Sequence, residues 1–173
     1  MSTLDLFETE RLVLSGWRRD QLDDLVRLHG DPVVTRYLSP GGEPWTHEAM
    51  AEALDHWIEL FETRQLGKLR VRRKADGVLV GRAGYGVYAR TGEPEIGYSL
   101  YPQFWGNGYA LEAATGLRDW IFRETDAPHF IAMADVDNAP SLKVLDKIGM
   151  TRTHVGPYDD GRIFQFYIMR RPA

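Results

Sequence analysis

Apolar residues recur at helical spacing in four stretches of the chain and predict four helices. Their apolar faces are Leu22, Leu25 and Val26; Met50, Ala53, Leu54, Trp57, Ile58 and Phe61; Ala110, Ala113, Ala114, Leu117 and Ile121; and Leu142, Leu145 and Ile148. Asp20, Thr46 and Asn138 precede the first, second and fourth stretches, where their side chains can cap a helix. Gly67 and Gly149 mark the expected ends of the second and fourth helices.

Shorter apolar segments bounded by turn residues predict seven strands. Their expected ranges are residues 11–17, 68–73, 78–88, 96–101, 129–135, 151–155 and 162–169. Asp-Gly pairs at 76–77 and 160–161 predict hairpin turns. The order is a strand, two helices, a three-stranded meander, and then helix, strand, helix and hairpin. It indicates one mixed α/β (α+β) domain over residues 1–173.

Composition excludes several classes of site. The net charge of −4 argues against non-specific nucleic-acid binding. The absence of cysteine excludes disulfides, thiol catalysis and cysteine-based metal sites. The five histidines are scattered without ligand spacing, so no metal site is expected. No run approaches transmembrane length and the first residues lack the apolar core of a signal peptide, so we expect a cytoplasmic protein without membrane contact.

A glycine turn before the third helix is the strongest sign of a ligand. Gly106 and Gly108 lie between a predicted strand and the helix, where free N–H groups and the helix dipole favour a phosphate. A P-loop needs Gly-Lys-Ser/Thr, but Tyr109 and Ala110 follow Gly108. A dinucleotide fingerprint needs a third glycine, but position 111 is Leu. The pyrophosphate of coenzyme A (CoA) is the third candidate ligand.

The spacing Gln103-x-x-Gly106-x-Gly108 matches the Gln/Arg-x-x-Gly-x-Gly/Ala signature of the GNAT superfamily of acetyl-CoA-dependent N-acetyltransferases. The chain resembles the branch that includes the ribosomal-protein N-terminal acetyltransferases. Further matches are Thr9-Glu10-Arg11-Leu12, Gly97-Tyr98, Leu100, Pro102, Trp105-Gly106, Gly108-Tyr109-Ala110, Glu112-Ala113, Asn138-x-x-Ser141, Val144-Leu145, Lys147 and Gly149-Met150. Asn107 departs from the pattern, because many members carry Lys or Arg there, and weaker CoA binding is expected.

This resemblance implies a central mixed, mostly antiparallel twisted sheet of about seven strands flanked by about four helices. The fourth and fifth strands would splay apart, and acetyl-CoA would enter that cleft. Its pantetheine arm would pair with the backbone of Tyr98, Ser99 and Leu100, with Asn138 binding the pantetheine amides besides capping its helix. The pyrophosphate would lie on the amides of Phe104, Trp105, Gly106, Asn107, Gly108, Tyr109 and Ala110, with Gln103 beside them.

Acetyl transfer needs a neutral amine. Deprotonating a lysine-like amine at pH 7 costs roughly 4–5 kcal/mol, against about 1–1.4 kcal/mol for an α-amine. Glu95, at the start of a strand, is the first candidate base, directly or through water; the alternative is a solvated carboxylate. By resemblance, Ser141 can protonate the leaving thiolate or bind near its sulfur; the alternative is an ordinary first-turn serine. Some family branches use a Tyr seven residues after the Asn, but here that residue is Leu145.

The acceptor stays open between a protein N-terminus and a small-molecule amine, including polyamines and aminoglycosides. Tyr37, Trp45, Tyr85 and Tyr158 can line its pocket or serve the core. Lys143 and Lys147 can pair with the CoA 3′-phosphate or simply be solvated. The hypothesis is direct transfer by a monomer or homodimer. The rival hypothesis is a non-catalytic acyl-CoA-binding sensor or regulatory module.

Overall fold

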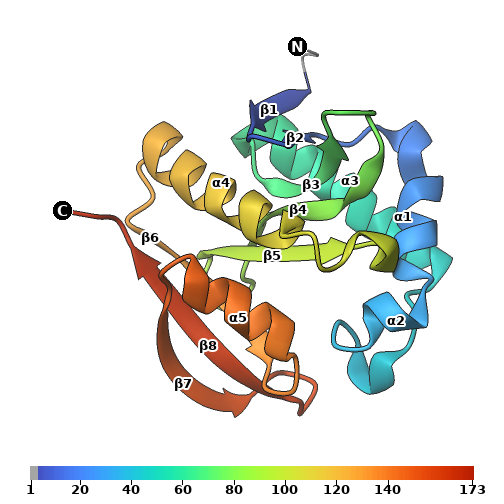
Figure 1. The fold of residues 1–173 in the computed structure, drawn as a ribbon. Coiled ribbons are helices and arrows are strands. Elements are labelled where there is room, and N and C mark those ends of the chain that lie inside the picture. The colour runs from blue at the N-terminus through green and yellow to red at the C-terminus, as the bar shows by residue number, and fades with distance from the viewer. Residues whose placement is uncertain (1–3) are drawn as a thin grey trace.

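The structure, a computed structural model, describes residues 4–173 and is built on one eight-stranded sheet (Figure 1). The strand order is β1-β2-β3-β4-β5-β6-β8-β7, and every neighbouring pair is antiparallel except β5 and β6. The strands are β1 (Asp5–Glu8), β2 (Leu12–Ser15), β3 (Gly67–Arg73), β4 (Leu79–Val87), β5 (Pro94–Leu100), β6 (His129–Asp135), β7 (Thr151–Pro157) and β8 (Ile163–Arg170). The mixed, mostly antiparallel sheet is confirmed, with one strand more than predicted.

The extra strand is β1, which the hydrophobic pattern does not reveal. It has four residues, Asp-Leu-Phe-Glu, and is too short to show an alternating pattern. It pairs with β2 at the edge of the sheet.

Two layers of helices cover the sheet. The α-helices are α1 (Leu22–His29), α2 (Pro32–Thr35), α3 (His47–Arg64), α4 (Tyr109–Glu124) and α5 (Ala139–Lys147), and short 3-10 turns occupy Arg19–Gln21, Pro40–Gly42 and Pro102–Phe104. The four predicted helices are α1, α3, α4 and α5, and the single turn α2 is a fifth. Figure 1 shows α4 and α5 in front of the sheet, with α3 behind it. Within residues 4–173, none of the helices combines the length and hydrophobicity of a membrane span.

Two of the three predicted N-caps are confirmed. Thr46 Oγ1 accepts a hydrogen bond from the Ala49 amide, and Asn138 Oδ1 accepts one from the Ser141 amide. Asp20 is not the cap of α1, because residues 19–21 form a 3-10 turn that places Gln21 at that position.

The end of α3 was predicted at Gly67, which is wrong. The helix stops at Arg64, and Gln65 takes the left-handed conformation with φ of 55°. Gly67 instead begins β3 with φ of 105°, where a Cβ would lie 2.8 Å from the carbonyl oxygen of Trp57. Glycine is required at this position because α3 lies so close to the strand, and not because the helix ends there.

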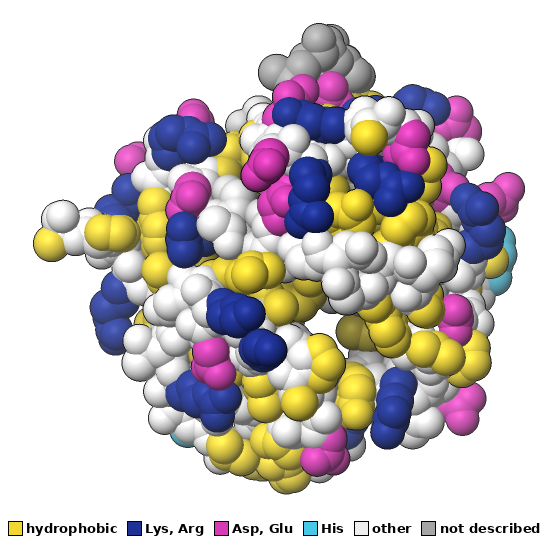
Figure 2. All heavy atoms as spheres, in the orientation of Figure 1, with side chains coloured by type: hydrophobic (Ala, Val, Ile, Leu, Met, Phe, Trp, Pro, Cys, Tyr) yellow, Lys and Arg dark blue, Asp and Glu magenta, His cyan; other side chains and the backbone are white. Residues whose placement is uncertain are grey.

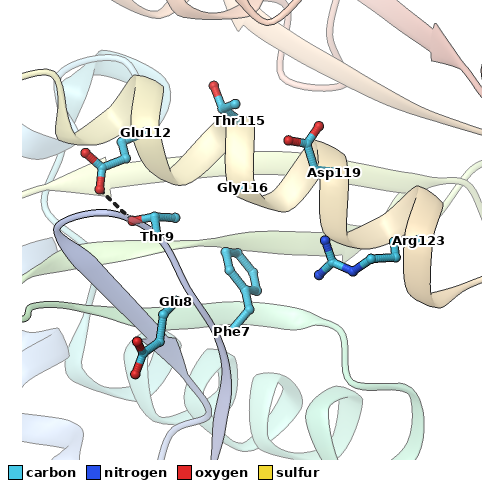
Figure 3. A pocket seen from close by; sticks show the side chains of 8 residues that line it. All are labelled: Phe7, Glu8, Thr9, Glu112, Thr115, Gly116, Asp119 and Arg123. Atoms are coloured by element: carbon cyan, nitrogen blue, oxygen red, sulfur yellow. Dashed lines mark hydrogen bonds between the residues drawn. The ribbon is translucent and has the colours of Figure 1, made fainter.

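The first turn of α4 is fastened to the start of the chain by Glu112. Its carboxylate accepts hydrogen bonds from Thr9 Oγ1 (2.5 Å), the Arg11 amide (2.9 Å) and Arg11 Nε (2.7 Å). The three bonds tie β1 and β2 to the helix that follows the glycine turn. Beside them lies a surface hollow of about 360 Å³, in which the Phe7 ring points toward Gly116 of α4 and the Glu8 carboxylate points away from the helix (Figure 3).

Replacing Glu112 by Gln should lower the free energy of unfolding by about 1–3 kcal/mol at pH 7, because charged hydrogen bonds are lost. Partial burial raises the pKa of Glu112, but the bonds from Thr9 and Arg11 outweigh it and hold the pKa below its usual value. A lowered folded-state pKa means that the contribution is complete above about pH 4.3 and disappears as the pH falls through the folded pKa. Urea unfolding at pH 7 and pH 3 measures this. Asp119→Asn, on the exposed side of α4, is the control and should change stability by less than about 0.5 kcal/mol.

Candidate active site

Strands β5 and β6 part after a single pairing. They run parallel and are paired only at Glu95 and Ile131, whereas β4 pairs with β5 at seven positions. From that pair β5 continues to Leu100 and β6 to Asp135 with no ladder between them. These are the fourth and fifth predicted strands, so the splayed cleft is confirmed. Figure 2 shows an opening through the molecule beside α5, with basic side chains next to it.

The gap that opens between β5 and β6 beyond Glu95 and Ile131 is called the wedge. The glycine turn lies at its wide end. Gly106 and Gly108 both have φ of 78°, which favours glycine, and Gly108 stands at the N-cap of α4. The amide of Glu112 bonds to the Gly108 carbonyl (3.0 Å), so the amides of residues 109–111 precede the first intrahelical bond. Trp105 and the two glycines are exposed. The arrangement offers N–H groups and the positive end of a helix dipole to an anion.

Asn107 holds the turn together with its side chain. Its Nδ2 donates to the carbonyls of Phe104 (3.0 Å) and Trp105 (3.2 Å). The Trp105 indole in turn donates to the Leu100 carbonyl (2.9 Å), which ties the turn to the end of β5. Gln103 is exposed on the 3-10 turn before it.

Arg11 brings a positive charge to the turn, a role that the sequence did not indicate. Its Nη1 donates to the Asn107 carbonyl (3.0 Å), and its guanidinium lies 4.5 Å from the centre of the Tyr109 ring. A Cβ on Gly108 would lie 3.5 Å from Arg11 Nη2. Because about a hundred residues separate Arg11 from the turn, only the fold brings them together.

Tyr98 links β5 to α5 across the wedge. Its hydroxyl donates to the Ser141 carbonyl (3.1 Å) and lies 3.2 Å from Ser141 Oγ. Burial raises the pKa of Tyr98 above its usual value, and the Ser141 bond opposes this only in part. The prediction assigned Tyr98 a backbone role, so this side-chain contact with Ser141 was missed.

Glu95 lies on the opposite face of β5. Alternation along the strand puts Glu95, Gly97 and Ser99 on one side and Ile96, Tyr98 and Leu100 on the other. Glu95 is half-buried, and its Oε1 would lie 3.7 Å from a Cβ on Gly97. The structure therefore separates the two predicted catalytic residues, with Ser141 on the α4–α5 side and Glu95 on the other.

Two buried cations accompany Glu95. Lys68 Nζ donates to the carbonyls of Gly84 and Glu95, both at 3.3 Å. Burial lowers the pKa of Lys68 to about 8, against an opposing effect of Glu95 and with a smaller lowering by Arg82. Arg82 Nε donates to His29 Nε2 (3.1 Å), and burial together with Arg82 lowers the pKa of His29 to about 2. Burial also lowers the pKa of Arg82 to about 10, and Glu95 opposes this.

Two of the four aromatic residues considered for the acceptor pocket, Tyr85 and Trp45, pack against other residues of the protein interior. The Tyr85 hydroxyl donates to the Leu117 carbonyl (2.9 Å) in the core under α4. Trp45 stacks on His29 with ring centres 4.1 Å apart.

The other two lie toward β8. Tyr158 stacks on Phe164 (4.8 Å between ring centres), and Arg162 Nη1 donates to the Tyr37 carbonyl (2.9 Å). Burial raises the pKa of Tyr158, and the charge of Glu95 adds to the effect.

Comparison with known proteins agrees with this geometry. Residues 11–151 match the family model described as an acetyltransferase (GNAT) domain. The uncharacterized N-acetyltransferase YnaD of Bacillus subtilis (strain 168) is 33% identical over 144 residues, covering 83% of this chain and 81% of that protein. An acetyltransferase structure from Agrobacterium tumefaciens str. C58 superposes with a TM-score of 0.84 at 25% identity, covering 98% of this chain and 96% of that one.

The ribosomal branch also shares the fold. The ribosomal L7/L12 α-N-protein acetyltransferase RimL, solved in complex with coenzyme A, superposes with a TM-score of 0.75 at 18% identity. The alignment covers 94% of this chain and 95% of that one. At this identity the likeness concerns the fold alone.

Replacing Lys68 by Met should change how stability depends on pH. The folded-state pKa of about 8 lies below the ordinary value of 10.5, so the folded protein loses this proton at lower pH than the unfolded chain. The wild type should therefore gain up to about 3 kcal/mol relative to the variant as the pH rises from 8 to 10.5. Urea unfolding at pH 7, 8, 9 and 10 measures the difference, and the exposed Lys143→Met is the control. A difference that stays constant across this range would contradict the prediction.

Proposed function

The chain belongs to the GNAT family of acetyltransferases, and we propose that it transfers the acetyl group of acetyl-CoA to a primary amine by direct attack on the thioester. One observation carries the proposal. The gap between β5 and β6 has a glycine turn with free helix-start amides at the end of β5 and a carboxylate at its apex, and an opening passes through the molecule beside α5. Such a passage lets a thioester and an amine meet from opposite sides.

The cofactor would occupy the α4–α5 side. We place the pantetheine arm along the backbone of Tyr98, Ser99 and Leu100, whose outer edge has no neighbouring strand in the described chain. Asn138, at the start of α5, is placed to bind the pantetheine amides. The pyrophosphate would take the amides of Phe104 to Ala110, with Gln103 at the rim. Arg11 would supply the positive charge that the residue at 107 lacks.

Glu95 would act as the base from the other side. The amine approaches the apex of the wedge, and Glu95 takes its proton directly or through a water as the nitrogen attacks the thioester carbon. Backbone N–H groups at the parted strands would stabilise the charge that develops on the thioester oxygen.

Ser141 would assist the departing sulfur. Its Oγ can donate to the thiolate while the Tyr98 hydroxyl, bonded to the Ser141 carbonyl, fixes the residue in place. A thiol pKa near about 8.5 makes the thiolate a fair leaving group, so this help is smaller than that of the base.

The acceptor remains a choice between a protein N-terminus and a small-molecule amine. An α-amine is the easier group to deprotonate near neutral pH, which favours it as the acceptor. Family membership favours turnover over the non-catalytic sensor. A cytoplasmic location, a single domain over 1–173, and a monomer or homodimer remain predictions.

Glu95→Gln should lower kcat for acetyl transfer about 10²–10⁴-fold, because the general base is lost, while acetyl-CoA still raises the thermal midpoint. Ser141→Ala should lower kcat about 10-fold. Thiol release from acetyl-CoA with a panel of peptides and small amines measures both, and the exposed Glu124→Gln is the matched control. Full activity of Glu95→Gln would remove the base assignment. A thermal shift with no acceptor-dependent thiol release would support the sensor, and no thermal shift would remove the cofactor assignment.

Arg11→Met should weaken acetyl-CoA binding about 10-fold, equivalent to about 1.4 kcal/mol, because a cation beside the pyrophosphate is lost. Isothermal titration with CoA measures this, and the loss should shrink as the salt concentration rises. Glu112→Gln is the control, because it loosens the same contact but keeps the cation. Equal weakening in both variants would assign the effect to the attachment of α4 and not to charge.

A further inference from the structure

The face of the sheet that carries Glu95 is crossed by two rows of paired residues. One row joins Lys68 of β3, Gly84 of β4 and Gly97 of β5, and the next joins Arg70, Arg82 and Ser99. Neighbouring residues in such a row lie about 5 Å apart. The rows lie two residues apart along β5, and Glu95 follows two residues beyond Gly97.

The Lys68 side chain runs from β3 across β4 to β5, where its ammonium lies beside Gly86 and Gly97. A Cβ on Gly97 would lie 2.6 Å from Lys68 Nζ, so a side chain there would displace the ammonium from its present position. Lys68 belongs to β3, but its ammonium lies beside Glu95, the residue at which β5 and β6 part.

Neither Lys68 nor Arg82 forms a salt bridge within residues 4–173, which distinguishes them from the neighbouring cations of β3. Arg70 and Arg72, the next alternate residues of β3, pair with Asp24 (3.1 Å) and Asp5 (2.9 Å). Lys68 and Arg82 are 9% and 5% exposed, yet within residues 4–173 neither comes within 4 Å of a carboxylate. Burying unpaired cations is costly, so a partner from outside the chain is expected.

The unpaired end of Arg82 is its planar fork. Its Nε is occupied by His29, but Nη1 and Nη2 donate to no described residue. Within residues 4–173 the unpaired atoms that are fully shielded from solvent are His29 Nδ1, Arg70 Nε and Arg72 Nε, so the two terminal nitrogens of Arg82 keep some solvent contact. Ser99, which pairs with Arg82 across the strands, is 9% exposed, and its Oγ also has no hydrogen-bond partner among the described residues. A guanidinium fork beside a hydroxyl fits the two oxygens of a carboxylate.

The charges in this cluster do not balance. Lys68 and Arg82 are cations, and Glu95 is the carboxylate that acts on both of them among the described residues. His29 is neutral, because its low pKa lets Nε2 accept from Arg82. An added carboxylate would remove the excess positive charge. The same excess disfavours an incoming ammonium and favours a neutral amine.

We infer that the acceptor carries a carboxylate as well as the amine, as a free amino acid or an acidic peptide terminus does, and that Arg82, Ser99 and Lys68 bind this carboxylate while Glu95 receives the proton of the amine. This rests on the proposed function and narrows its acceptor class. Polyamines and aminoglycosides, which have no anionic group, are disfavoured by the same cations.

Binding of product analogues tests the inference without turnover. Isothermal titration of the CoA-loaded protein would compare two pairs of compounds. The first pair is N-acetyl-L-leucine and N-acetyl-L-leucinamide, which differ in the α-carboxylate. The second pair is N-acetyl-L-isoglutamine, whose carboxylate is on the side chain, and N-acetyl-L-glutaminamide. The anionic member of at least one pair should bind 10-fold or more tighter. Arg82→Met should abolish this preference and Arg82→Lys should restore part of it. Ser99→Ala, a milder change, should reduce it if Arg82→Met does not fold. Equal affinities, or no measurable binding of either anion, would overturn the inference.

Acetyl transfer to the parent amines separates this inference from the proposed function. With L-leucine beside L-leucinamide, and L-isoglutamine beside L-glutaminamide, the carboxylate should lower KM more than kcat, and Arg82→Met should raise KM for that member alone. Equal KM values for the two members of each pair would overturn the inference and leave the acetyltransferase assignment unaffected. Tight anion binding with no transfer to any amine would support the anion site and remove the catalytic proposal.

Discussion

The functional account depends on one constraint, the parting of β5 and β6 after a single pair. Parallel strands normally hydrogen-bond along their length, so two facing edges left unpaired inside a sheet need another partner. Here the strands meet at Glu95 and Ile131 and then diverge toward the glycine turn on one side and α5 on the other. Tyr98 spans the gap by bonding Ser141, and Glu112 secures the helix that follows the turn. An extended ligand that pairs with the free edge of β5 would complete the sheet.

The wedge also divides the chemistry between two faces. The α4–α5 face offers amides, Arg11 and a helix dipole, all suited to an anionic cofactor. The other face offers Glu95 beside two buried cations, which suits a neutral amine that carries its own negative charge. The Lys68 ammonium has crossed from β3 to β5, where it lies 2.6 Å from the position that a Cβ on Gly97 would take.

The sequence predicted the parts of this structure that local rules control. The caps Thr46 and Asn138, the bounds of β6 and the glycine turn all follow from patterns within a few residues. The errors occur where tertiary contacts decide. Gly67 is glycine because α3 lies against it, and the four-residue β1 is a strand because β2 pairs with it. Arg11 at the turn, the Tyr98 hydroxyl on Ser141 and the unpaired fork of Arg82 depend on segments far apart in the chain, so no local pattern could reveal them.

The most direct test of the central claim is backbone amide hydrogen exchange with and without CoA, read residue by residue. If the wedge is the cofactor site, CoA should slow exchange at residues 98–100 of β5 and at residues 104–110 of the turn, while the exposed edge strand β7 stays unchanged. Unchanged exchange at both segments, or protection confined to the hollow between β1 and α4, would contradict the account.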